Sequence, residues 1–292
     1  MGFSFLSWNV RHYRGDRDRF QDVSQLISDL NPDVFGLLEF EVKFTRGGPD
    51  EAPQNNRADM RELMLHRFPE YDFAVTDSRQ GVETIVGFRN GMFEQVIWTQ
   101  RRSFAATDFL RPGALISLND GTDFYSLLFL HTDSGVAKPD YDNRQAMFRK
   151  IWSLQTSLTG ATPSNNPNLI VLGDLNTMGW RGKVTGRQEI DALTHDAAQN
   201  GMRLLDKDRP ETWHAWGKGP RGNRRKLRVD ELAGAKRSNL DHVIASDGLE
   251  FANAGHGGEP VHVRGWHQLQ DAARADYLWD LSDHSALYAK LR

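Results

Sequence analysis

The stretch that most constrains this chain is a short apolar run ending in an acid and an amide, NLIVLGDLNTMG at residues 168–179. Residues 169–172 are apolar and mostly branched, which predicts a buried strand. Gly173 allows a sharp change of direction, and Asp174 and Asn176 are types that favour turns. Side chains two residues apart on an extended chain point the same way, so the acid and the amide are expected to face one spot. The stretch therefore predicts either a functional site at a strand end or an ordinary turn that closes a core strand.

The rest of the chain alternates between strand and helix patterns. Apolar residues at helical spacing predict helices over residues 18–30, 59–68, 141–158 and 187–200. Strands are predicted over residues 3–8, 33–38, 72–76, 84–89, 93–99, 114–118, 124–130, 240–245, 249–254 and 285–291. The Gly-, Pro- and Asn-rich stretch 45–58 is expected to be a loop. This order of elements suits two packed sheets with helices outside them, in one domain spanning residues 1–292.

The composition excludes several classes of protein. The 292 residues are 39% hydrophobic and 26% charged, as in ordinary globular proteins. The net charge of -3 argues against a surface built throughout for DNA but leaves room for a local basic patch. The absence of cysteine excludes disulfides, thiolate zinc sites, Fe–S clusters and a Cys nucleophile. The first ten residues do not form a secretory signal, and no run approaches the roughly 20 apolar residues of a membrane span, so a cytoplasmic location is expected.

Polar side chains stand at the ends of several predicted strands. Each has an ordinary explanation when taken alone, such as a turn former, a solvated acid, a helix cap or a satisfied core histidine. Their recurrence at one kind of place indicates that they converge at one sheet edge, as enzyme sites often do. They are Asn9, Glu39, His131, Asp174 and Asn176 at the ends of strands, and Asp241, Asp283 and His284 at the starts of strands.

Six motifs along the chain carry a resemblance to a known family. In order they read SWNVR, DVFGLLEFE, LHTDSG, NLIVLGDLN, SNLDHVIAS and LSDHSAL, and they extend from about Ser4 to the C-terminus. This ordered set resembles the endonuclease/exonuclease/phosphatase superfamily, which has the DNase I-like fold. The resemblance implies a four-layer α/β/β/α sandwich, with two packed mixed β-sheets flanked by helices. It also implies hydrolysis of phosphoesters.

The resemblance further implies a metal site. Glu39 resembles the main carboxylate ligand of a catalytic Mg²⁺, and Asn9 resembles the amide beside it. Asp283 resembles a further residue of the same metal site, which helps Asn9. Oxygen ligands without a thiolate suit Mg²⁺, with Mn²⁺ as a substitute.

Five further residues take catalytic roles by the same resemblance. Asp174 resembles the acid that orients or deprotonates the attacking water, and Asn176 resembles a donor to a phosphate oxygen. His284, held by Asp241, resembles the histidine that contacts the phosphate, and His131 resembles a second histidine near the leaving group. A carboxylate beside a histidine fixes its tautomer and favours the imidazolium, which can stabilise a developing oxyanion.

A basic segment, residues 218–228, bears on the substrate. It is Gly-rich and follows the aromatic stretch TWHAW at residues 212–216. Basic groups beside aromatic rings suit a nucleic-acid backbone and its bases, and the alternative is a solvated loop. The residues predicted to bind substrate are Arg221, Arg224, Arg225, Lys226 and Arg228.

The leading interpretation is a Mg²⁺-dependent phosphodiesterase acting as a nuclease on DNA or RNA. A second interpretation is a phosphatase or phosphodiesterase acting on a lipid or small molecule. A third is a non-catalytic binding domain of the same fold. The inositol 5-phosphatase branch is disfavoured because SNLDH at residues 238–242 stands where that branch has Trp-Cys-Asp-Arg.

Overall fold

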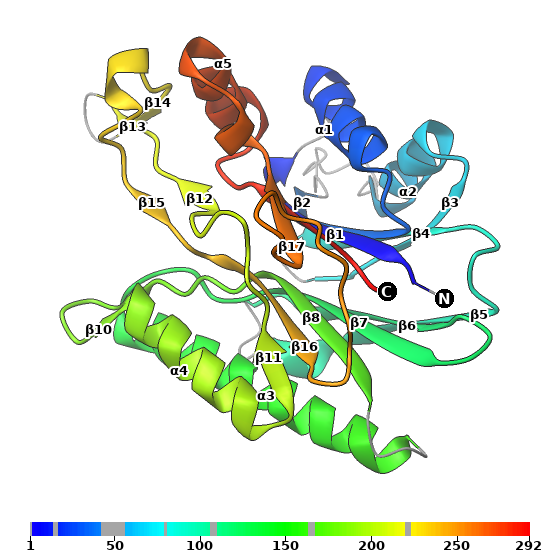
Figure 1. Ribbon diagram of the computed structural model, residues 1–292. Coiled ribbons are helices and arrows are strands. Elements are labelled where there is room, and N and C mark those ends of the chain that lie inside the picture. Colours follow the sequence, from blue (N-terminus) through cyan, green and yellow to red (C-terminus); the bar gives the residue numbers. More distant parts are fainter. Residues whose placement is uncertain are drawn as a thin grey trace, which may run out of the picture.

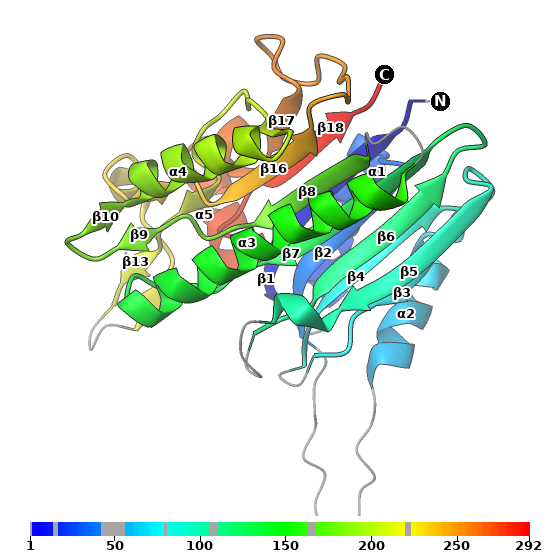
Figure 2. The same cartoon turned by 90° about the horizontal axis from the view of Figure 1, so that it is seen from below.

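The computed structural model describes residues 2–13, 17–41, 56–78, 81–105, 110–162, 167–219 and 223–292. Two six-stranded β-sheets stack face to face between two layers of helices (Figures 1 and 2), which confirms the predicted four-layer sandwich. The first sheet comprises, in spatial order, β17 (Val261–Arg264), β18 (Ala286–Lys290), β1 (Ser4–Tyr13), β2 (Val34–Glu41), β4 (Val82–Arg89) and β3 (Tyr71–Val75).

The second sheet contains the apolar run NLIVLGD of residues 168–174. It comprises, in spatial order, β11 (Met202–Leu204), β16 (Asp241–Ser246), β8 (Asn168–Asp174), β7 (Phe124–His131), β6 (Gly113–Asn119) and β5 (Gln95–Arg101). Strands β7 and β8 are parallel, whereas β16 and β8 are antiparallel. The sheet is therefore mixed, as expected.

Helices cover the outer face of each sheet. The first sheet is covered by α1 (Arg17–Leu30) and α2 (Asn56–Arg67), and the second by α3 (Lys138–Ala161) and α4 (Gly186–Gln199) (Figures 1 and 2). The short elements are β9 (Gly179–Trp180), β10 (Val184–Thr185), β12 (Trp213–His214), β13 (Gly217–Lys218), β14 (Arg224–Arg225), β15 (Arg237–Ser238), η1 (Arg102–Phe104), η3 (Val229–Glu231), η4 (Trp266–Gln268) and η5 (Tyr277–Leu281). The short helix α5 (Asp271–Asp276) packs against η5 and η3.

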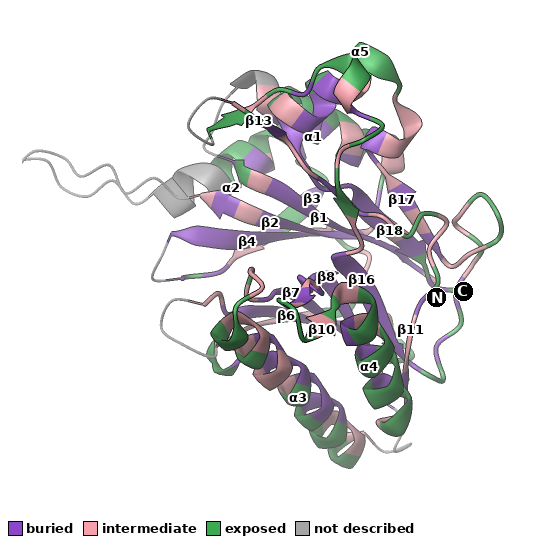
Figure 3. Ribbon diagram, turned by 90° about the vertical axis from the view of Figure 1, so that its left-hand side faces the viewer, coloured by how far each residue is buried: buried purple, intermediate pink, exposed green. Residues whose placement is uncertain are grey.

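The main core lies between the two sheets, where the ribbon is almost continuously buried (Figure 3). Strand β1 shows why the apolar pattern runs unbroken there. Phe5 points into the layer between the sheets, while Leu6 and Trp8 point into the layer under the helices, and all three are buried. A strand covered on both faces buries both sets of alternating side chains.

Backbone pairing brings three predicted site residues side by side. Asp174, at the end of β8, pairs with Asp241 of the antiparallel strand β16. It also pairs with His131, at the end of the parallel strand β7. The hydrogen-bond register of the second sheet therefore places two acids and a histidine at one edge.

Several stretches differ from the expectation, including β11 and the short strands β9, β10, β12 and β15, which were not predicted. Residues 249–254 were predicted to be a strand, but only Phe251 forms a bridge there, to Leu291, and the strand of that region is β17. Most of the predicted loop at 45–58 lies outside the described residues, and its last three residues belong to α2. The basic segment contains β13 and β14, which pair as a small antiparallel hairpin. Residues 266–281, for which no element was predicted, form η4, α5 and η5.

Candidate active site

The predicted catalytic residues gather around a cavity of about 240 Å³ at the ends of the central strands. Asn9 and Asp241 lie directly behind it, in contact with residues that face it. The lining comprises Arg11, His12, Glu39, His131, Ser134, Asp174, Asn176, Met178, Trp213, Arg224, Leu240, Asp283 and His284. Strand ends, as the sequence predicted, supply most of the reactive groups.

Asp174 is the centre of this arrangement. Its Oδ2 accepts a hydrogen bond from Asn9 Nδ2 at 3.0 Å and lies 3.4 Å from His131 Nε2 and 3.7 Å from His284 Nε2. Its Oδ1 accepts from the backbone N–H of Asn176 at 3.1 Å. Burial raises the pKa of Asp174, opposed by His284 and reinforced by Asp241 and Glu39. A carboxylate with a raised pKa can exchange a proton near neutral pH.

The sharp turn before Asp174 depends on Gly173. Its φ is +141°, and a Cβ at this position would lie 2.0 Å from the carbonyl oxygen of Leu130. No other residue type allows β8 to approach β7 this closely while its backbone turns. Gly173 therefore sets the direction in which the following carboxylate enters the cavity.

The buried acid Asp241 orients the ring of His284. Asp241 Oδ2 lies 2.8 Å from His284 Nδ1, which fixes the ring and leaves Nε2 facing Asp174. Burial lowers the pKa of His284, but the charges of Asp241 and Asp174 outweigh burial and raise it well above its ordinary value. His284 is therefore an imidazolium at neutral pH and can donate to an anionic oxygen.

Glu39 is the carboxylate that faces the cavity from the first sheet. Burial raises its pKa, but the charges of His131 and His12 outweigh burial and lower the pKa to about 2. His131 itself is buried, and burial together with the charge of Arg111 lowers its pKa well below the ordinary value, against the upward pull of Glu39. The φ of Glu39 is +62°, a left-handed conformation uncommon for a residue with a side chain and frequent at functional sites.

The donor set fits a hard divalent cation. Asp283 receives a hydrogen bond from Trp213 Nε1 on Oδ2 at 3.0 Å, while its buried Oδ1 has no hydrogen-bond partner among the described residues. An unpaired carboxylate oxygen in the same cavity as the ionised Glu39 is what a cation would satisfy. The amide nitrogen of Asn9 donates hydrogen bonds to Glu39 and Asp174. Its amide oxygen accepts a hydrogen bond from the backbone N–H of Arg11 at 2.8 Å. It therefore orients both acids, and its role as a metal ligand stays a prediction.

The basic segment only partly faces the site. Arg224 lines the cavity, whereas Arg225 pairs with Glu231 and Lys226 pairs with Asp276. Arg228 pairs with Asp230 at 3.2 Å. Arg221 lies outside the described residues. Contact of these residues with substrate stays a prediction.

Six residues of the lining were not predicted from the sequence: Arg11, His12, Ser134, Met178, Trp213 and Leu240. Arg11 and His12 were not selected because the first strand was expected to end at Trp8, yet β1 continues through an irregularity to Tyr13. Arg11 is the last residue of the first motif, SWNVR, and His12 follows it directly, so the run NVRH could have indicated both. Trp213 was noted only as part of an aromatic stretch, and its bond to Asp283 accompanies a backbone bridge between Trp213 and His284.

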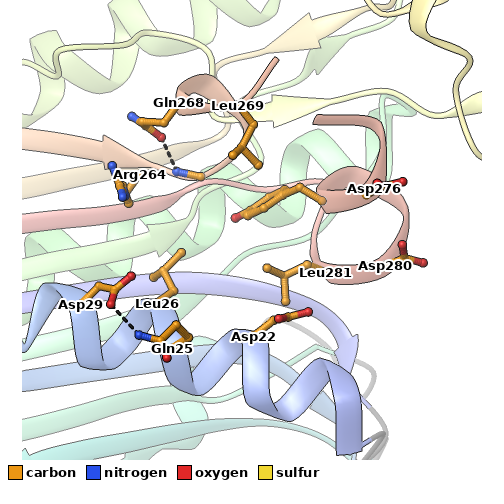
Figure 4. Close-up of a pocket in the computed structure, with 12 residues that line it drawn as sticks. Asp22, Gln25, Leu26, Asp29, Arg264, Gln268, Leu269, Asp276, Asp280 and Leu281 are labelled. Atoms are coloured by element: carbon orange, nitrogen blue, oxygen red, sulfur yellow. Dashed lines mark hydrogen bonds between the residues drawn. The ribbon is translucent and has the colours of Figure 1, made fainter. Parts of the chain in front are cut away.

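A second cavity, of about 340 Å³, lies between α1 and η5 (Figure 4). Its rim carries Asp22, Asp29, Asp276 and Asp280 with a single arginine, Arg264. Acids repel an anionic substrate, so this cavity is unsuited to a phosphoester.

The chain matches the model of the Endonuclease/Exonuclease/phosphatase family over residues 6–284. It therefore belongs to this family, as the motifs predicted. Membership identifies it as a phosphoric ester hydrolase. No curated protein matches the sequence.

Solved structures share the fold across the full length. TDP2 from D. rerio, complexed with a single-strand DNA product, aligns with a TM-score of 0.63 at 16% identity and covers 100% of this chain and 99% of its own. Truncated Caenorhabditis elegans TDP2 gives 0.62 at 16%, covering 99% and 97%. A family protein from Leptotrichia buccalis gives 0.61 at 15%, covering 99% of both chains. At these identities the likeness supports the fold.

Proposed function

We propose that this protein is a divalent-metal-dependent phosphodiesterase that cleaves nucleic acid. The observation that carries the proposal is the set of nitrogens around Asp174 Oδ2, contributed by Asn9, His131 and His284. This arrangement holds one buried carboxylate beside a cationic donor. It is what attack of water on a phosphodiester requires.

The chain's own residues divide the reaction between them. Asp174 accepts a proton from the attacking water, because its raised pKa makes it a base near neutral pH. His284, kept cationic by Asp241, donates to an oxygen of the phosphate as negative charge develops there. Asn176 presents its side chain next to Asp174 and donates from Nδ2 to the carbonyl of Thr132 at 3.2 Å, which fixes the amide.

Glu39 and Asp283 are the residues that would hold the cation. When bound there, Mg²⁺ or Mn²⁺ would neutralise phosphate charge, which is the contribution that carboxylates alone cannot make. Glu39 stays ionised over the whole physiological range because of its low pKa. Asp283 is held in place by Trp213.

Nucleic acid is favoured as the substrate because the described wall of the cavity presents Arg11 and Arg224. A cationic wall suits a polyanion, whereas a lipid substrate calls for an exposed apolar rim. The TDP2 structure with a DNA product supports the same class by analogy of fold.

The test compares the wild-type protein with Asp174→Asn on single-stranded DNA, duplex DNA, RNA and a small chromogenic phosphodiester, each with Mg²⁺. Wild type should cleave at least one nucleic acid, and the variant should lose roughly two orders of magnitude or more in kcat. Asp196→Asn, an exposed acid on α4, is the matched control. Turnover of the chromogenic phosphodiester without cleavage of any of the three nucleic acids would overturn the proposal, as would wild-type kcat in Asp174→Asn.

A further inference from the structure

The indole of Trp216 lies against two guanidinium groups at the edge of the active site. The carbon centres of Arg11 and Arg224 lie 4.4 Å and 4.2 Å from the centroid of the Trp216 ring. Trp279 meets Trp216 edge to face, with the ring centroids 5.7 Å apart. Cations are attracted to the face of an indole, so Trp216 holds both charges in one place.

Arg11 is fixed by hydrogen bonds as well as by stacking. Its guanidinium donates to the carbonyls of Leu278 at 2.7 Å and Trp279 at 2.6 Å. Its backbone N–H donates to Asn9, which in turn contacts Asp174. The position of this cation is therefore coupled to the catalytic centre.

Unlike the basic residues that follow Arg224 in the chain, these two arginines form no ion pair with a carboxylate of the described residues. Arg225, Lys226 and Arg228 each pair with a carboxylate. Neither Arg11 nor Arg224 has a carboxylate within ion-pair distance among the described residues. Burial lowers the pKa of Arg11, Asp283 raises it, and repulsion from Arg224 lowers it again, with smaller upward pulls from Asp280 and Glu39. Two like charges held together favour an anion between them.

Both guanidiniums line the same cavity as Asp174 and His284, which act on the phosphate that is cleaved. We propose that Arg11 and Arg224 form a subsite for a second phosphate, the neighbour of the cleaved phosphodiester along a nucleic-acid strand. Arginine suits this role because its planar fork binds two phosphate oxygens at once. Trp216 acts as the support that positions the two forks. This inference rests on the proposed function and specifies its substrate class as a strand that carries adjacent phosphates.

The test uses three thymidine dinucleotides that share one internal phosphodiester. One has no terminal phosphate, one has a 5′-phosphate and one has a 3′-phosphate. Cleavage of the internal bond is followed by chromatography with Mg²⁺ present. A charged hydrogen bond to the second phosphate should make kcat/KM for one of the phosphorylated dinucleotides about tenfold or more higher than for the unphosphorylated one.

Arg224→Ala decides the matter because Arg224 is exposed, so the loss of its side chain should leave the fold intact. The ratio of kcat/KM for the phosphorylated dinucleotide to kcat/KM for the unphosphorylated one should fall close to one in this variant and in Arg11→Ala. Arg187→Ala removes an exposed arginine on α4 that pairs with Asp191, and should keep the preference.

Two results would overturn the subsite: equal kcat/KM for all three dinucleotides in wild type, or an unchanged preference in Arg224→Ala. Failure of the proposed function looks different, because no internal bond would then be cleaved in dinucleotides or in longer strands.

Discussion

Arg144 and Glu189 form a two-pronged ion pair in which both side chains are fully buried. Arg144 Nε lies 3.0 Å from Glu189 Oε1, and Nη2 lies 3.1 Å from Oε2. The same guanidinium donates to the carbonyls of Gly135 and Gly179, and Glu189 accepts from the N–H of Gly179. The pair connects α3 to α4. Through Gly135 and Gly179 it also fixes the segments that follow His131 and Asn176. It therefore supports the cavity from beneath.

Arg144→Met should cost about 3–5 kcal/mol of unfolding free energy, because Glu189 would remain buried without its cation. Urea denaturation measures this. The double variant Arg144→Met/Glu189→Leu should recover part of the loss. The exposed pair Arg187 and Asp191 is the control, and Arg187→Ala should change stability by less than about 1 kcal/mol. Equal effects in the buried and exposed variants would contradict the supporting role.

Asp241→Asn should lower the pKa of His284. Burial opposes the imidazolium, and Asp241 makes the largest contribution that keeps it charged. An NMR titration of the His284 ring in wild type and variant measures the change directly. The variant should also lose about two orders of magnitude in kcat at neutral pH. An unchanged pKa would show that Asp174 alone holds the proton on His284.

Removal of divalent cations should abolish activity and leave the thermal transition close to its original temperature. Glu39 and Asp283 provide oxygens for a cation, while the core is built from apolar contacts between the two sheets. Turnover is measured in excess chelator and again after addition of Mg²⁺ or Mn²⁺. Glu39→Gln should raise the Mg²⁺ concentration needed for half-maximal activity. Full turnover in chelator would exclude the metal-dependent reaction.

Stability should rise with pH above neutrality because of Lys207. This lysine donates to Asn239 at 2.5 Å and to the backbone carbonyl of Asp241, and burial lowers its pKa from the ordinary 10.5 to about 7. Between those values the unfolded chain binds more protons than the folded chain, so the free energy of unfolding increases with pH. The slope from one such group is at most about 1.4 kcal/mol per pH unit.

Urea denaturation at pH 7, 8 and 9 tests this dependence. Lys207→Met should reduce the slope, whereas Lys183→Met, at an exposed position, should keep it. A slope that is the same in Lys207→Met and wild type would show that another group is responsible.

The sequence predicted the central strands and their polar ends because these follow from local apolar runs. The run at residues 169–172 is buried, and the acid after it is at the centre of the site. Interactions between distant segments could not be predicted in this way. Trp213 reaches Asp283, 70 residues away, because the backbone of Trp213 forms a bridge with that of His284. The left-handed backbone at Arg11 and His12 likewise arises where β1 and β2 lose register.

The basic segment shows a further limit. A sequence displays its charges but not their partners, so Arg224 and Arg225 look equivalent on paper. In the fold one faces the cavity and the other pairs with Glu231, because neighbouring residues on a strand point to opposite sides. Charge density along a chain thus overstates the charge available to a ligand.

The pairing of His131, Asp174 and Asp241 across three adjacent strands has an evolutionary consequence. These groups are aligned by backbone hydrogen bonds in the interior of the protein, so the chemistry is inherited with the sheet. Arg224 and Trp216, in contrast, stand on segments beyond the strand ends. Descendants of such a protein can exchange those segments and acquire new substrates, while the machinery that cleaves the bond is passed on unaltered.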